Sequence, residues 1–117
     1  MHSPEFENLV NEARAQINEI QPTDVKRMLD SGEDFTLIDV REAEEQAKGV
    51  IPGAVKLPRG ILERDIETVT TDQDRKIVLY CGGGFRSALA ALNLKKMGYK
   101  NVISMDGGWR GWQELQK

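Results

Sequence analysis

The chain has 117 residues, 39% of them hydrophobic and 30% charged, which suits one domain with a modest core. No apolar run approaches the ~18 residues that a membrane-spanning helix needs, and a net charge of -3 argues against a protein held to nucleic acid by bulk charge. The polar, acidic start does not resemble a secretory signal. With no possible internal disulfide, this favours a cytoplasmic location.

The scarcity of cysteine and histidine limits the chemistry further. The single cysteine, Cys81, excludes an internal disulfide, a Cys-x-x-Cys redox pair and a cysteine-rich zinc site. The single histidine, His2, is so close to the terminus that we expect it to be disordered, and histidine-assisted catalysis is close to excluded. We therefore expect no metal and no cofactor. Any nucleophile must be activated by backbone groups and charge.

The N-terminal segment reads as a helix. Apolar residues recur at three- and four-residue steps from Phe6 to Ile20, and Ser3 can cap the first turn. We expect this stripe to dock on the domain's own core, although it could instead bind a partner. A second short helix follows Pro22 and ends at Gly32.

The rest of the chain alternates strands with helical turns. Strands are expected at 35–40, 54–57, 76–81 and 101–105, and helices at 41–48, 61–66, 87–97 and 109–115. The apolar residues of 76–81 are consecutive, which indicates burial on both faces of a sheet. This order predicts an α/β fold with a mostly parallel sheet covered on both sides. Ligands bind such sheets beyond the carboxyl ends of the strands, where Cys81 lies.

Cys81 opens a glycine-rich loop between a strand and a helix. Three adjacent glycines can bend sharply and turn successive N–H groups inward as an anion-binding nest. The positive end of the next helix and the guanidinium of Arg86 add to this potential, which favours a Cys81 thiolate. A lone cysteine at a strand end is more often buried and inert. However, ordinary turns seldom need three glycines in a row, so we favour a reactive Cys81.

Four motifs, in this order, resemble the rhodanese family of single-domain sulfurtransferases. They are L-I-D-V-R-E at 37–42, G-V-I-P-G-A at 49–54, V-L-Y-C-G-G-G-F-R-S-A at 78–88 and D-G-G-W-R-G-W at 106–112. Val50 stands where the family usually has histidine. The resemblance implies a three-layer α/β/α rhodanese-like domain over 15–117, with a five-stranded, mainly parallel sheet. Residues 1–14 would then be an N-terminal helical extension.

The resemblance also implies a reaction that these residues can perform. Thiolate Cys81 would attack the outer sulfur of a donor such as thiosulfate or a persulfide, and would be left as a persulfide itself. A thiol or cyanide would then take the sulfur, and a sulfur-accepting protein is a further candidate acceptor. No base is needed once Cys81 is ionised, which fits the scarcity of histidine.

Further residues are expected around Cys81. The loop amides and Arg86 would hold the anionic donor, within the set Gly82, Gly83, Gly84, Phe85 and Arg86. Arg59 follows a strand end and could reach the same crevice, although a solvated surface position is equally open. Asp39 and Arg41 match the family's Asp-x-Arg, and we favour an ion pair that braces the loop over contact with substrate. Ser87 is expected to support the loop.

The rim of the loop bears on the choice of donor. Family members that use thiosulfate efficiently often carry a cationic side chain just after the cysteine, where this chain has glycines. We therefore expect weak thiosulfate activity and room for a bulkier donor, with Arg59 the first candidate to supply the missing charge.

Two other functions stay open. Cysteine phosphatases, some on the same fold, place five residues between Cys and Arg, whereas four separate Cys81 from Arg86. No acid for the leaving group is evident in the sequence. A non-catalytic regulatory module of this fold would typically have lost the cysteine.

Overall fold

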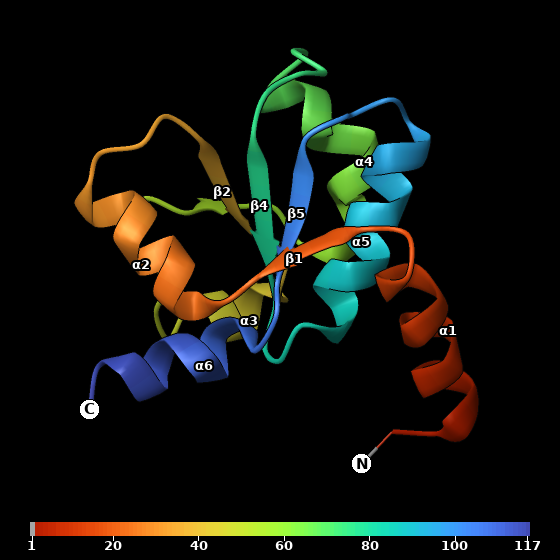
Figure 1. Cartoon of the computed structure of the whole chain (residues 1–117), viewed down its shortest axis with the longest axis horizontal. Coiled ribbons are helices and arrows are strands. Elements are labelled where there is room, and N and C mark those ends of the chain that lie inside the picture. The colour runs from red at the N-terminus through yellow and green to blue at the C-terminus, as the bar shows by residue number, and fades with distance from the viewer. Residues whose placement is uncertain (1) are drawn as a thin grey trace.

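The computed structural model describes residues 2–117, and its centre is a five-stranded sheet (Figure 1). The strands lie in the order β1-β5-β4-β2-β3, and every neighbouring pair is parallel. Their bounds are β1 Asn18–Ile20, β2 Thr36–Asp39, β3 Val55–Lys56, β4 Ile77–Tyr80 and β5 Val102–Met105. All carboxyl ends therefore meet at one edge of the sheet.

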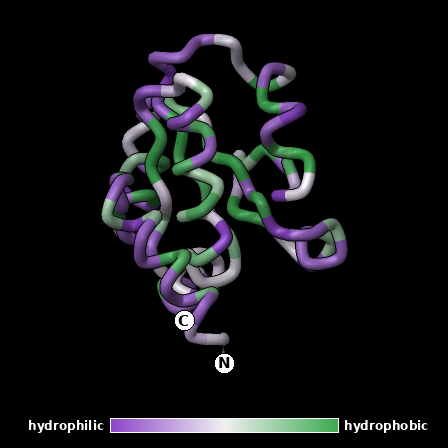
Figure 2. Tube along the Cα trace, turned by 90° about the vertical axis from the view of Figure 1, so that its right-hand side faces the viewer, coloured by the Kyte–Doolittle hydropathy of each residue, from purple (hydrophilic) through white to green (hydrophobic). Residues whose placement is uncertain are grey.

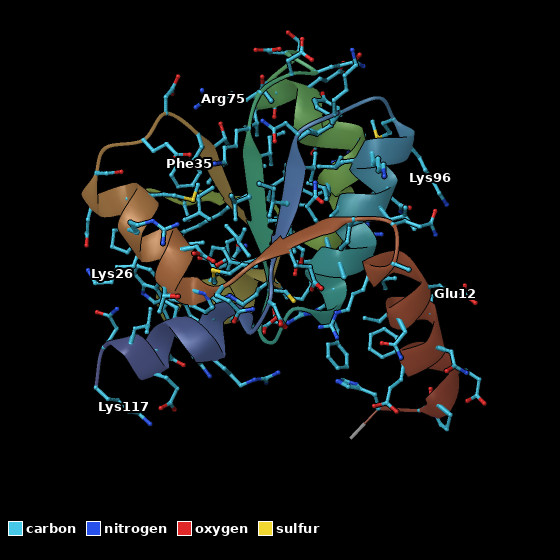
Figure 3. The ribbon with its side chains drawn as sticks, viewed as in Figure 1. Glu12, Lys26, Phe35, Arg75, Lys96 and Lys117 are labelled. Atoms are coloured by element: carbon cyan, nitrogen blue, oxygen red, sulfur yellow. The ribbon has the colours of Figure 1, made fainter. Side chains whose placement is uncertain are left out.

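Helices cover both faces of this sheet, which confirms the predicted three-layer α/β/α fold (Figure 1). Their bounds are α1 Pro4–Arg14, α2 Pro22–Asp30, α3 Ala43–Gln46, α4 Leu62–Asp65, α5 Phe85–Lys96 and α6 Gly108–Leu115. Short 3₁₀ turns flank α4 at Arg59–Ile61 and Ile66–Thr68. In the views of Figures 1 and 3, α2 and α6 lie to one side of the sheet, α4 and α5 to the other, and charged side chains such as Glu12, Lys96 and Lys117 point outward. Among residues 2–117, no helix has the length and apolar character needed to cross a membrane.

The central strand β4 connects two hydrophobic cores. Ile77 and Leu79 face the α4–α5 side, whereas Val78 and Tyr80 face the α2–α6 side, and all four are fully buried. This confirms the burial on both faces that the consecutive apolar run predicts. Figure 2 shows the same arrangement as hydrophobic stretches through the middle of the molecule and mostly hydrophilic loops at its edges.

The predicted N-terminal helix is wrong in its second half. Ser3 caps α1 as expected, and the Phe6 N–H donates to its hydroxyl oxygen at 3.1 Å. However, α1 ends at Arg14, and β1 then pairs with the otherwise open edge of β5. Ile17 and Ile20 consequently pack in opposite cores. Their three-residue spacing fits a helix face, but it also fits the two sides of an extended chain, whose backbone groups the sheet edge satisfies.

Helix α5 begins two residues earlier than the sequence predicts. Gly84 is its N-cap residue, with a φ of +104° that other residues adopt only with strain. Phe85 and Arg86 therefore belong to the first helical turn instead of the loop, and this fixes the direction of both side chains.

Candidate active site

Cys81 lies directly after β4, at the edge of the sheet where the strands' carboxyl ends meet. Cys81 is only 1% exposed, yet it lines a pocket of about 490 Å³. Three groups of residues form the walls of this pocket. These are the loop after Cys81, side chains of α3, α5 and α6 that include Phe85, and two aromatic residues at the N-terminus of the chain.

The Cys81 sulfur sits among hydrogen-bond donors. The Gly84 N–H donates to Sγ at 3.1 Å and the Ser87 N–H at 3.4 Å, while the Ser87 hydroxyl oxygen lies 3.6 Å away. Ser87 in turn shares a 2.8 Å hydrogen bond with the hydroxyl of Ser104, and both serines are fully buried. Such donors stabilise a negative charge on sulfur. The nest expected from the glycine loop therefore contacts the sulfur through one glycine amide and the first turn of α5.

The first turn of α6 holds the loop in place. The Trp109 N–H donates to the carbonyl of Cys81 at 2.7 Å, and the Arg110 N–H donates to that of Gly82 at 3.0 Å. This attachment carries the Arg110 side chain over Gly83. A Cβ atom at Gly83 would overlap the Arg110 guanidinium, whose Cζ would lie only 3.2 Å from it. Glycine at this position therefore leaves the space that the guanidinium occupies.

Arg86 reaches the pocket already paired with a carboxylate. Its two terminal nitrogens donate to the oxygens of Glu45, on α3, at 2.9 and 3.2 Å. This hydrogen bonding is the main reason that the pKa of Glu45 falls to about 2, so Glu45 is ionised at neutral pH. The same contact is the largest cause that raises the pKa of Arg86, and the neighbouring Cys81 adds to it.

Asp39 and Arg41 form a buried ion pair at the carboxyl end of β2. An Arg41 terminal nitrogen donates to the Asp39 carboxylate at 2.8 Å and to the Gly49 carbonyl at 2.6 Å, and its guanidinium lies 4.5 Å from the centre of the Trp109 ring. Desolvation lowers the pKa of Arg41, but the contacts with Asp39 outweigh it and raise the pKa overall. Neither side chain of the pair lines the pocket, a placement that suits bracing.

Arg59 does not reach the pocket. It starts the 3₁₀ turn after β3 and forms an ion pair with Glu63, one turn further on, at 2.7 Å. Its strand-end position suggested the crevice because the sequence does not show in which direction the next turn carries the side chain.

Several residues that line the pocket were missed by the sequence prediction. Ring centres of His2 and Phe85 lie 4.6 Å apart, and those of Phe6 and Phe85 5.9 Å apart, so the N-terminal segment forms an aromatic wall beside Cys81. Nothing in the sequence placed His2 near Cys81, whereas the structure includes it in the lining of the pocket. Arg110 stood within the D-G-G-W-R-G-W motif, but no local signal pointed it at the loop.

The parallel sheet with helices on both faces and the glycine-rich loop after Cys81 together define a domain of the rhodanese type. The chain belongs to the rhodanese-like domain family, whose model matches residues 21–115. It is 37% identical over 98 residues to YtwF of Bacillus subtilis, which carries a provisional sulfurtransferase name, and covers 92% of that protein with 84% of its own length. It is 34% identical over 96 residues to a sulfurtransferase of Allochromatium vinosum, with 82% of this chain and 88% of that protein covered.

Other similarities extend beyond the family model or concern longer proteins. A solved Rhodopseudomonas palustris structure, described as a possible tyrosine phosphatase, matches with a TM-score of 0.87 and 31% identity over 99% of this chain and 94% of that one. YrkF of Bacillus subtilis, provisionally named a sulfur carrier protein, is 37% identical over 102 residues, which is 87% of this chain but 54% of YrkF. The relatives named as sulfurtransferases support sulfur transfer as the general activity of this family member.

Proposed function

We propose that the protein moves a sulfane sulfur from an anionic donor to a thiophilic acceptor through a persulfide on Cys81. The Cys81 thiolate attacks the outer sulfur of thiosulfate, the S–S bond of the donor breaks, and its electron pair leaves with sulfite. An acceptor thiolate or cyanide then attacks the outer sulfur of the persulfide. The Cys81–sulfur bond breaks, and the thiolate is regenerated without any net proton transfer.

The hydrogen bonds to Cys81 Sγ are the observation that carries this proposal. Two backbone N–H groups already point at the sulfur, so they need no reorganisation when it carries charge. The Ser87 hydroxyl can turn to donate to the thiolate while Ser104 donates to Ser87. The same donors would stabilise the thiolate leaving group of the second step, because it is the same sulfur atom.

Phosphatase chemistry is the second candidate, because the Rhodopseudomonas palustris protein is described in that way. The pocket's carboxyl group is a poor acid for a leaving group, since the pairing with Arg86 lowers the pKa of Glu45 to about 2. The loop is also one residue shorter than that of cysteine phosphatases. We therefore favour sulfur transfer, which asks for no general acid.

Turnover with two substrates distinguishes these functions. We expect thiosulfate and cyanide to give thiocyanate with the wild-type protein and none with Cys81→Ser, and we expect no hydrolysis of an aryl phosphate by either protein. Hydrolysis of the phosphate without thiocyanate formation would favour the phosphatase. Inactivity towards both, and towards persulfide donors, would leave a binding module.

A further inference from the structure

The pocket contains two guanidinium groups with different electrostatic surroundings. Arg86 shares its charge with Glu45, as described above. Arg110, in contrast, has no Asp or Glu within ion-pair distance among residues 2–117. An incoming anion can therefore pair with Arg110 without displacing a carboxylate, whereas at Arg86 it must compete with Glu45.

The Arg110 guanidinium also lies close to the position that a cationic side chain at Gly82 would take. A Cβ atom placed on Gly82 would lie 3.3 Å from an Arg86 terminal nitrogen and 3.9 Å from one of Arg110, so both guanidinium groups face the same stretch of the rim. From the sequence we expected no cationic side chain beside Gly82, Gly83 and Gly84. In the structure these glycines leave space for the Arg110 guanidinium of α6, and the Arg110 N–H donates to the Gly82 carbonyl.

Another part of the pocket lining is aromatic. His2 and Phe6 pack against Phe85, and the Arg14 guanidinium lies 5.0 Å from the centre of the Phe85 ring, where α1 packs on α5. Because the family model begins at residue 21, two of the three rings, those of His2 and Phe6, come from a segment outside the matched region. A pocket of about 490 Å³ falls within the roughly 300–1,000 Å³ of sites that enclose organic ligands, and exceeds what a small inorganic ion fills.

We propose that Arg110 and the wall formed by His2, Phe6 and Phe85 are a two-part donor subsite for organic sulfane-sulfur anions. Arg110 binds the anionic group, and the rings contact an apolar body attached to it. This inference rests on the proposed sulfur transfer. With an organic thiosulfonate, the Cys81 thiolate forms a bond to the outer sulfur, the S–S bond of the donor breaks, and the electron pair leaves with the sulfinate, so that charge and atoms balance.

The charge half of the subsite is tested by Arg110→Ala, with Arg110→Lys as the conservative variant. Thiosulfate binding is measured by calorimetry on proteins that also carry Cys81→Ser, so that no transfer is needed for the readout. We expect Arg110→Ala to weaken binding roughly tenfold, as for loss of a hydrogen-bonded charge, and Arg110→Lys to recover part of it. Arg64→Ala, which removes an exposed arginine paired with Asp65 outside the pocket, controls for net charge.

Gly83→Ala tests the placement of Arg110 without touching its charge. The added Cβ must displace the guanidinium, and the far end of a flexible side chain moves at little cost to the fold. We expect Gly83→Ala alone to weaken thiosulfate binding, and to have no further effect in a protein that already carries Arg110→Ala. If Gly83→Ala weakens thiosulfate binding equally in the wild-type and Arg110→Ala proteins, the Arg110 guanidinium does not lie over Gly83.

The aromatic half is tested by comparing benzenethiosulfonate with methanethiosulfonate as donors. We expect wild-type kcat/KM to favour the aromatic donor, and Phe6→Ala to reduce that preference several-fold. An unchanged preference in Phe6→Ala, or unchanged anion binding in Arg110→Ala, overturns the subsite. If the wild type forms no Cys81 persulfide with any donor while Arg110 still governs anion binding, it is the proposed function that fails.

Discussion

Glu45→Gln removes the carboxylate that neutralises Arg86 and leaves a side chain of similar shape. The two side chains are 36% and 34% exposed, so solvent screens the pair and its net contribution is about 0.5–1 kcal/mol. Loss of the negative charge should also make the pocket more attractive to an anionic donor by a similar free energy. We therefore expect the KM for thiosulfate to fall about two- to fivefold.

The pH dependence of stability follows from the same pair. Because the folded pKa of Glu45 is lowered from 4.5 to about 2, its contribution is complete above pH 4.5 and is lost as the pH falls towards 2. Denaturant titrations should find Glu45→Gln less stable than wild type at pH 7, with the difference shrinking through that window. Glu63→Gln, which breaks the comparable Arg59 pair outside the pocket, is the matched control and should leave KM unchanged. A rise in KM for Glu45→Gln, or an equal fall for both variants, would refute the reasoning.

Three further substitutions test the frame around Cys81. Arg41→Ala leaves the Asp39 carboxylate buried without its partner and should lower the free energy of unfolding by about 3–5 kcal/mol, measured as a lower urea midpoint. A loss under about 1 kcal/mol would contradict a bracing role for the pair. Ser104→Ala, which acts on the sulfur through Ser87, should slow Cys81 alkylation at neutral pH, and an unchanged rate would contradict a role for Ser104. Gly84→Ala puts a Cβ atom on a residue with positive φ, within 3.2 Å of the Gly107 nitrogen. We expect thermal unfolding to show a stability loss of about 1–2 kcal/mol, and Cys81 to be alkylated more slowly. A variant as stable and as reactive as wild type would contradict a rigid loop conformation at Gly84.

The sequence was informative wherever the signal is local. The consecutive apolar run that ends at Cys81 predicted a strand buried on both faces, because only a sheet covered on both sides tolerates it. The run of three glycines predicted a tight turn between β4 and the next helix, because the conformation of a turn depends on neighbouring residues, but the helix begins at Phe85, two residues earlier than expected. The helical reading of Ile17 and Ile20 failed because a distant strand edge, β5, decided the structure there.

The parts of the site that could not be predicted depend on long-range placement. Arg110 is brought to the loop by α6, Glu45 by α3, and His2 by the packing of α1 on α5. Each of these residues looks like an ordinary surface residue in the sequence. Arg59, the cation that the sequence suggested instead, lies outside the pocket and pairs with Glu63, four residues later.

The central claim is that Cys81 carries the transferred sulfur, and the intact mass of the protein tests it most directly. After incubation with thiosulfate and removal of the excess, the wild-type mass should increase by one sulfur atom, and the fragment that contains Cys81 should carry it. Cyanide or a thiol should restore the original mass, and Cys81→Ser should show no increase. A wild-type protein that turns over thiosulfate without this mass gain, or a Cys81→Ser variant that turns over normally, would contradict the persulfide account.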